Sequence, residues 1–180
     1  FVMLLAVVLS LSVLPTLSAD IFPTVSAAEK YVVQSGTAVG TINNQLASYS
    51  AGTVVDVTLA ASIDFTNTST DTFGSGITGI IVPSGITVNL FLNGNTIKFE
   101  RTSGGAWQLP YVYAIHNKGT LNIYSGSSAT ATSSTAKISV INVRTGMGPD
   151  VKRELSYCAL EAVHNEGALT INNKVAIDVT

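Results

Sequence analysis

The chain has 180 residues, a net charge of −2 at pH 7, 11% charged residues and 46% hydrophobic residues. A charge this small excludes long-range attraction to nucleic acid or to anionic lipid. So few charged side chains, among many Thr, Ser, Asn, Gly and Val residues, indicate a β-rich protein rather than a helical one.

Residues 1–15, FVMLLAVVLSLSVLP, are almost wholly apolar, and small residues follow in PTVSAAEK. The run is shorter than the about 20 residues that span a bilayer. It therefore predicts the hydrophobic region of a secretory signal peptide, residues 1–27, with cleavage ahead of Ala28. Leu17 and Ala19 offer a second, weaker cleavage site. A leading Met and a basic segment are missing, so we expect the sequence to begin inside that signal. We expect no membrane span in the mature part of the chain.

Residues 28–51 predict a cap ahead of the first repeat. Apolar side chains in this segment follow helical spacing: Val39, Ile42, Leu46 and Tyr49. The stretch YVVQ at residues 31–34 predicts a short strand before the helix. A helix here would cover the open end of an apolar column whose strand edges otherwise stay unpaired.

A ten-residue phrase, AIHNKGTLNI at residues 114–123, returns as AVHNEGALTI at residues 162–171. Segments with apolar residues at alternate positions begin at four glycines: Gly52, Gly85, Gly119 and Gly167. Alternation predicts strands with one buried face; in the first segment the predicted buried residues are Val54, Val57 and Leu59. Each repeat has three short strands, counting the one that carries the His-Asn pair. Three short strands cannot close a core, so the repeats must stack.

The predicted fold class is therefore all-β, a solenoid of about four rungs over residues 52–180. Three insertions leave the stack at one corner, and we expect them to pack side by side: residues 66–79, 100–113 and 144–161. The Ser-rich stretch at residues 124–135 leaves from another corner and predicts a flexible or extended loop. Thr180 falls in mid-rung, so we expect further rungs after it.

These segments resemble a known family. VPSGITVNLFLNGNTI at residues 82–97, the two His-Asn phrases, and the helix followed by GTVVDVTLAASIDF are similar to repeats of the pectin-lyase-like superfamily. More narrowly, they look like the cell-surface proteins of this type that Gram-positive gut bacteria export. The resemblance covers residues 37–180 and implies a right-handed parallel β-helix. Family members include polysaccharide lyases, glycoside hydrolases and adhesins, so the resemblance does not select one function.

His116 and His164 occupy equivalent places in the two phrases, which puts them one rung, about 4.8 Å, apart. Stacked imidazoles can bind a metal or transfer protons, but no Cys, Asp or Glu is present at the same place in both phrases. We therefore predict no metal site. We assign both histidines a structural role, stacked beside a ladder of Asn117 and Asn165. The turn glycines have a structural role too, and we expect positive φ where glycine follows the Asn.

Carboxylates do not form a repeated column. Asp64 and Asp178 hold matching positions, but Lys98 and Ser139 or Asn142 occupy that position in the rungs between them. Alternating charges indicate a solvated face with ion pairs worth under about 1 kcal/mol each. We predict no catalytic residue and no cofactor.

Aromatic and basic residues of the corner insertions are the predicted binding residues: Trp107, Tyr111, Tyr113, Tyr157, Arg101 and Arg153. Exposed rings stack on sugar faces or anchor protein interfaces; alternatively, these rings only bury the insertions against the solenoid. We expect a secreted or cell-wall-associated adhesin, ligand-binding module or spacer, with glycans or host and cell-surface proteins as partners. The alternative is the N-terminal part of a polysaccharide lyase or glycoside hydrolase whose catalytic rungs lie beyond residue 180.

Overall fold

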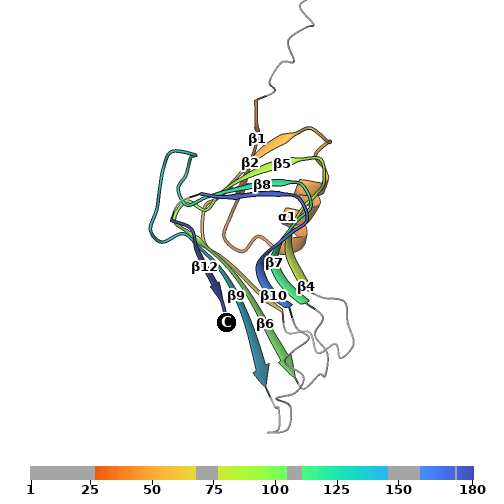
Figure 1. Ribbon diagram of the computed structural model, residues 1–180, viewed down its shortest axis with the longest axis vertical. Coiled ribbons are helices and arrows are strands. Elements are labelled where there is room, and N and C mark those ends of the chain that lie inside the picture. The colour runs from red at the N-terminus through yellow and green to blue at the C-terminus, as the bar shows by residue number, and fades with distance from the viewer. Residues whose placement is uncertain (1–26, 68–76, 105–110, 146–158, 173) are drawn as a thin grey trace, which may run out of the picture.

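The computed structural model describes residues 27–67, 77–104, 111–145, 159–172 and 174–180 (Figure 1). Twelve strands of these residues form three sheets. The first sheet, in the order β1-β2-β5-β8-β11, contains β1 (Glu29–Val33), β2 (Val54–Leu59), β5 (Thr87–Phe91), β8 (Thr120–Tyr124) and β11 (Ala168–Ile171). The second, β12-β9-β6-β3, contains β3 (Ile63–Asn67), β6 (Thr96–Gly104), β9 (Lys137–Thr145) and β12 (Ala176–Val179). The third, β10-β7-β4, contains β4 (Ile77–Val82), β7 (Tyr111–Asn117) and β10 (Ala159–Asn165).

All strand pairs of the described residues are parallel, and equivalent positions of successive repeats lie opposite each other. In the first sheet Val88 lies opposite Leu121, which lies opposite Leu169. In the second sheet Ile97 lies opposite Ile138. The predicted all-β solenoid of stacked parallel rungs is confirmed. The strand predicted at residues 31–34 is also present, as β1, and pairs with β2.

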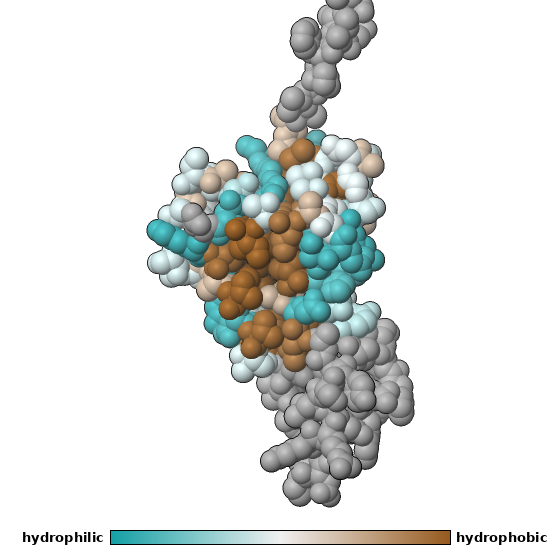
Figure 2. All heavy atoms as spheres, in the orientation of Figure 1, coloured by the Kyte–Doolittle hydropathy of each residue, from teal (hydrophilic) through white to brown (hydrophobic). Residues whose placement is uncertain are grey.

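Apolar side chains fill the space between the three sheets. Figure 1 looks nearly along the stack, so that the sheets form the sides of a triangle, and Figure 2 shows brown, apolar side chains gathered between them. The bulkiest fully buried side chains include Ile42, Leu46, Leu59, Leu92, Ile97, Ile115, Leu121, Ile123 and Ile138. Burial of one such side chain contributes about 1.5–3 kcal/mol. The core is therefore one continuous column through the stacked rungs, whereas Ile171, Ile177 and Val179 of the last rung are exposed.

Several strands differ in detail from the prediction. The strands that extend into the stretches predicted as insertions are β3, β4, β6, β7, β9 and β10. In β2 the buried residues are Val55, Val57 and Leu59, whereas Val54 is half-buried, so the alternation begins one residue later than predicted. Tyr111 and Tyr113, predicted in an insertion, are the first and third residues of β7. Aromatic and β-branched residues favour strands, and the stretch YVYAIHN has enough of them to extend the strand toward the corner.

The predicted cap is confirmed as the helix α1 (Val39–Ala47), which buries Ile42 and Leu46 in the core. The strand β4 is the edge of the third sheet next to this helix, and its outer backbone groups have no strand to pair with among the described residues. Asn43 of α1 supplies the missing partners. Its Nδ2 donates to the Gly79 carbonyl at 3.0 Å, and its Oδ1 accepts from the Ile81 amide at 2.8 Å. A side-chain amide has the same donor and acceptor as a peptide group, so Asn43 replaces one residue of a neighbouring strand.

Nine residues long, α1 is the one helix of the described residues, and no helix among them is long and apolar enough to cross a bilayer. The predicted signal peptide lies outside the described part of the chain, except for Ala27.

Turn glycines serve two different purposes. Gly52 and Gly85 have φ of 87° and 83°, a conformation that favours glycine. The prediction of positive φ at Gly119 and Gly167 is wrong. A Cβ on Gly167 would collide with the carbonyl oxygen of Gly119, and a Cβ on Gly119 would collide with that of Pro83. These two positions need glycine because the backbone of the neighbouring rung passes too closely for a side chain.

Replacing Asn43 by Ala should lower the free energy of unfolding by about 1–3 kcal/mol, because the Gly79 carbonyl and the Ile81 amide lose their partner. Denaturant unfolding followed by circular dichroism measures the change. Asn44, the next residue of α1, is exposed, so Asn44→Ala is the matched control and should change the value by less than about 0.5 kcal/mol. Equal effects of the two substitutions would contradict a structural role for the Asn43 amide.

Candidate functional site

The third sheet ends in a short ladder of amides. Asn117 is fully buried, and its Nδ2 donates to the Asn165 Oδ1 at 2.7 Å and to the Ala168 carbonyl at 2.8 Å. Its Oδ1 accepts from the Gly119 amide at 3.2 Å. The ladder holds two successive rungs together at the turn that directly follows the histidines.

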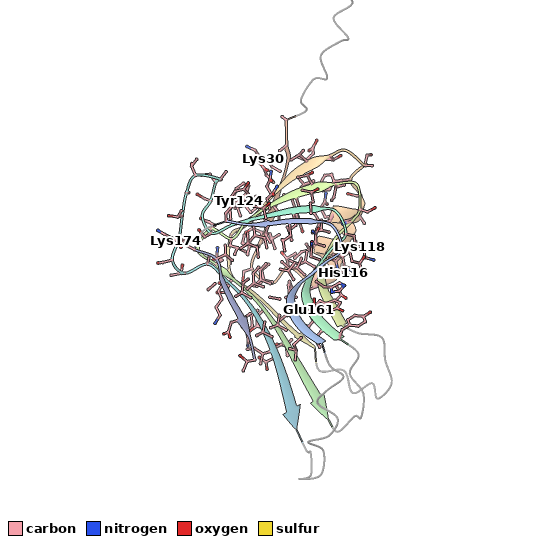
Figure 3. All side chains as sticks on the ribbon, in the orientation of Figure 1. Lys30, His116, Lys118, Tyr124, Glu161 and Lys174 are labelled. Atoms are coloured by element: carbon pink, nitrogen blue, oxygen red, sulfur yellow. The ribbon has the colours of Figure 1, made fainter. Side chains whose placement is uncertain are left out.

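Beside the ladder, four side chains form what we call the histidine cluster: His116, His164, Glu161 and Glu166. The histidines lie opposite each other on β7 and β10. The Nε2 atoms of His116 and His164 lie 2.9 and 3.5 Å from one carboxylate oxygen, Oε1 of Glu166. Nδ1 of His164 lies 2.9 Å from Oε2 of Glu161. Figure 3 shows His116 and Glu161 on the side of the solenoid formed by β7 and β10.

Tyrosine rings pack against this cluster. Tyr113 stacks on His164 with ring centroids 4.2 Å apart and planes 4° from parallel, and Tyr111 stacks on Tyr113 at 4.6 Å. His116 meets His164 edge to face, with ring centroids 5.0 Å apart and ring planes at 70°. We expected the two imidazoles to stack on each other, and they do not. The Tyr111–Tyr113–His164 stack limits rotation of the His164 ring.

Neighbouring groups of the cluster shift the pKa values of Glu166 and Tyr113. The hydrogen bond from His116 lowers the pKa of Glu166, and desolvation, the next largest effect, opposes it. The charge of Lys118, and those of His116 and His164 when they are protonated, lower the pKa further. Burial raises the pKa of Tyr113, and the nearby charge of Glu161 raises it further. Glu166 therefore stays ionised below the pH at which an ordinary glutamate takes up a proton.

Glu166 is not among the predicted site residues, because a search for residues repeated in both phrases passes over it. Lys118 holds the corresponding place in the earlier phrase, since Asn117 and Asn165 lie opposite each other. The change from Lys to Glu, the one reversal of charge between the two phrases, was the signal available in the sequence.

A second surface feature, which we call the outer groove, lies on the solvent side of the first sheet and has a volume of about 480 Å³. It is lined by Lys30, Val32, Asp56, Thr58, Asn89, Phe91, Tyr124, Ser127, Ser128 and Ala129. The rings of Phe91 and Tyr124 stack with centroids 4.9 Å apart. Figure 3 shows Lys30 and Tyr124 over the first sheet, away from the histidine cluster.

Polar side chains form a ladder beside these rings. Nδ2 of Asn89 donates to Oδ1 of Asp56 at 2.8 Å, and Nδ2 of Asn122 donates to Oδ1 of Asn89 at 3.0 Å. The three residues are spaced by 33 residues, one rung each, as are Phe91 and Tyr124. This spacing is visible in the sequence, but the apolar alternation does not reveal it, because all three residues lie between the buried positions of their strands.

The Ser-rich stretch after β8 borders the outer groove and is held at its base. The hydroxyl of Thr135 donates to the Gly94 carbonyl at 2.7 Å, and the Gly94 amide donates to the Ser125 carbonyl at 2.9 Å. The hydroxyl oxygen of Ser125 accepts from the Ser133 amide at 3.1 Å. The loop predicted here is thus tied to the turn of the preceding rung, and its Ser127 and Ser128 form one wall of the groove.

Of the predicted binding residues, Tyr111 and Tyr113 lie next to the histidine cluster. Tyr113 is only 8% exposed, enclosed between Tyr111 and His164, so its ring face is not free for a ligand. Arg101 belongs to β6, but its side chain is outside the described part of the chain. Trp107, Arg153 and Tyr157 also fall outside the described residues, as does the predicted packing of the insertions.

The predicted column of mixed charge is confirmed. Asp64 lies opposite Lys98, Lys98 opposite Ser139, and Ser139 opposite Asp178. Nζ of Lys98 lies 3.2 Å from Oδ2 of Asp64, and Nζ of Lys137 lies 2.7 Å from Oδ2 of Asp178. These are solvated ion pairs of the second sheet.

The chain was compared with protein-family models, with curated proteins and with solved structures, and none of them matches it.

Glu166 should titrate at a lower pH than an ordinary glutamate, and His116→Ala should raise its pKa, because the main cause of the shift is the His116 hydrogen bond. A folded-state pKa below the unfolded value means that the pair stabilises the fold above the unfolded pKa of about 4.3, and that this contribution is lost as the pH falls through the folded pKa. Carboxyl ¹³C NMR titration in metal-free buffer measures both proteins. An unchanged pKa in His116→Ala would contradict the assignment.

Proposed function

We propose that this chain is a glycan-binding module of an exported, surface-attached β-solenoid protein, and that the outer groove holds the glycan. The observation that carries the proposal is the ring of Tyr124, backed by the largely buried ring of Phe91 on which it stacks, beside Asp56 and Asn89 in one groove. Asn122, which is not among the lining residues, extends their ladder by its hydrogen bond to Asn89. Aromatic rings cover the apolar faces of sugars, while amide and carboxylate groups exchange hydrogen bonds with their hydroxyls.

The arrangement favours a neutral, extended glycan. Lys30 and Asp56 line the groove with opposite charges, so the lining as described has no net charge from these groups. The side chain of Val32 adds exposed apolar surface, at 50% exposure. Because rungs repeat about every 4.8 Å, a chain laid along the stack meets similar polar groups rung after rung.

Export and surface attachment are part of the same proposal. The apolar stretch at residues 1–15 has the character of a secretory signal. A stack of rungs is stiff and grows in length with copy number, so that it can hold a binding groove away from a cell surface. Both features suit an adhesin or a ligand-binding stalk.

The catalytic alternative gains no support from the described residues. Glycoside hydrolysis uses two carboxyl groups on either side of the scissile bond. Among the residues that line the outer groove as described, Asp56 is the one carboxylate, and it accepts a hydrogen bond from Asn89. We therefore propose binding rather than hydrolysis for this groove.

A glycan array probed with the purified chain, followed by calorimetry on the best ligand, tests the proposal. Tyr124→Ala and Asn89→Ala should each weaken binding about tenfold or more, the effect of losing about 1.4 kcal/mol at a central contact. Tyr111→Ala, a matched change on the third sheet, should leave the affinity unchanged. A loss of binding in Tyr111→Ala but not in Tyr124→Ala would move the site to the third sheet and contradict the proposal.

A further inference from the structure

The histidine cluster brings three potential metal-ligating atoms close together. One ring nitrogen of His116, one of His164 and a carboxylate oxygen of Glu166 all lie within 4.8 Å of one another. Two imidazoles and a carboxylate form a donor set that zinc sites use. In such a site, with bonds of about 2.0–2.2 Å in tetrahedral directions, neighbouring donor atoms lie about 3.3 Å apart. The separations of 2.9 and 3.5 Å from the Glu166 oxygen are close to that spacing.

The orientation of His164 is already set for a metal. A carboxylate only accepts hydrogen bonds, so Nδ1 of His164 carries the proton that it shares with Glu161. The neutral ring then keeps its lone pair on Nε2, the atom that faces Glu166. A carboxylate that holds the second nitrogen of a metal-bound histidine is a common feature of zinc sites. Tyr113 stacked on the ring holds this orientation.

His116 needs only a change of tautomer. Its Nε2 now donates to Oε1 of Glu166 at 2.9 Å. When a divalent ion takes the place of that proton, the proton moves to Nδ1 or to solvent, and both Nε2 and the Glu166 oxygen become ligands. The side chain of Glu166 is 52% exposed and that of His116 15%, so an ion can enter from solvent.

We infer that His116, His164 and Glu166 form a zinc site that links two successive rungs, with Glu161 as the positioning residue for His164. His116 belongs to β7, whereas His164 and Glu166 belong to the next rung, at β10 and directly after it. The ion would therefore tie together neighbouring strands that are otherwise held by backbone hydrogen bonds and the Asn117–Asn165 ladder. Three protein ligands leave the fourth position of a tetrahedron for water or for a donor from outside.

This site departs from the sequence-based expectation of no metal, which rested on the lack of an acidic residue common to both phrases. The site needs only one carboxylate, since two histidines from neighbouring rungs share it. The inference is independent of the outer groove, which lies on a different sheet.

Calorimetric titration of the purified, untagged chain with Zn²⁺ tests the site. We expect one ion per chain and a rise in melting temperature with Zn²⁺, since an ion that binds only the folded state stabilises it. Ca²⁺ and Mg²⁺, which prefer oxygen ligands, should not bind at the same concentrations. Glu166→Gln should weaken zinc binding by more than about 100-fold. Loss of a residue that only hydrogen-bonds to a ligand costs about 10–100-fold, and loss of a ligand itself costs more.

Two further variants separate ligands from supporting groups. Glu161→Gln should weaken binding about 10–100-fold but keep the visible spectrum of the Co²⁺-substituted protein, because the ligands are unchanged. Asp178→Asn, which removes a remote carboxylate paired with Lys137, should leave binding unchanged. Either of two results would overturn the inference: no saturable zinc binding by the parent chain, or equal zinc affinity in the parent, His164→Gln and Glu166→Gln.

Discussion

Parallel pairing of successive rungs in one register is the constraint on which the rest of this structure depends. Each position of a strand meets the equivalent position of the next rung about 4.8 Å away. An apolar residue therefore packs on an apolar residue, as Val88 does on Leu121, and an amide bonds to an amide, as Asn89 does to Asn122. The backbone at Gly119 and Gly167 comes so close that a side chain has no room. Stability and surface chemistry thus arise from the same repetition.

The two candidate sites use that repetition in different ways. In the outer groove, polar groups recur at one strand position and aromatic rings at another, which produces an elongated surface with little net charge. In the histidine cluster the two histidines repeat, but Glu166 replaces Lys118, so one negative charge is placed between two imidazoles. A surface that repeats from rung to rung fits the proposed extended glycan. A single changed residue within the repeat fits one bound ion.

Most of the fold could be predicted because buried positions are constrained: alternating apolar residues, glycine at the turns and a helix with Ile42 and Leu46 ahead of the stack. The features that could not be predicted lie where the constraint is weaker. Half-buried Val54 is as apolar as Val55, so the pattern alone does not fix the face of β2. The sequence does not distinguish a glycine that is required because the neighbouring backbone is close from one that is required because φ is positive. The partners of outward residues such as Asn89 and Glu166 depend on how successive rungs are aligned. The core residues determine that alignment, so the outward residues carry no pattern of their own.

Disulfide trapping across the first sheet tests the register most directly. In a Cys158→Ser background, Asp56→Cys with Asn89→Cys places thiols on residues that lie opposite each other, whereas Asp56→Cys with Thr87→Cys places them two residues out of register on the same face. A disulfide needs Cα atoms about 4.4–6.8 Å apart. The first pair should close under mild oxidation and the second should remain reduced. Equal closure of the two pairs, or closure of only the second, would contradict the in-register stack.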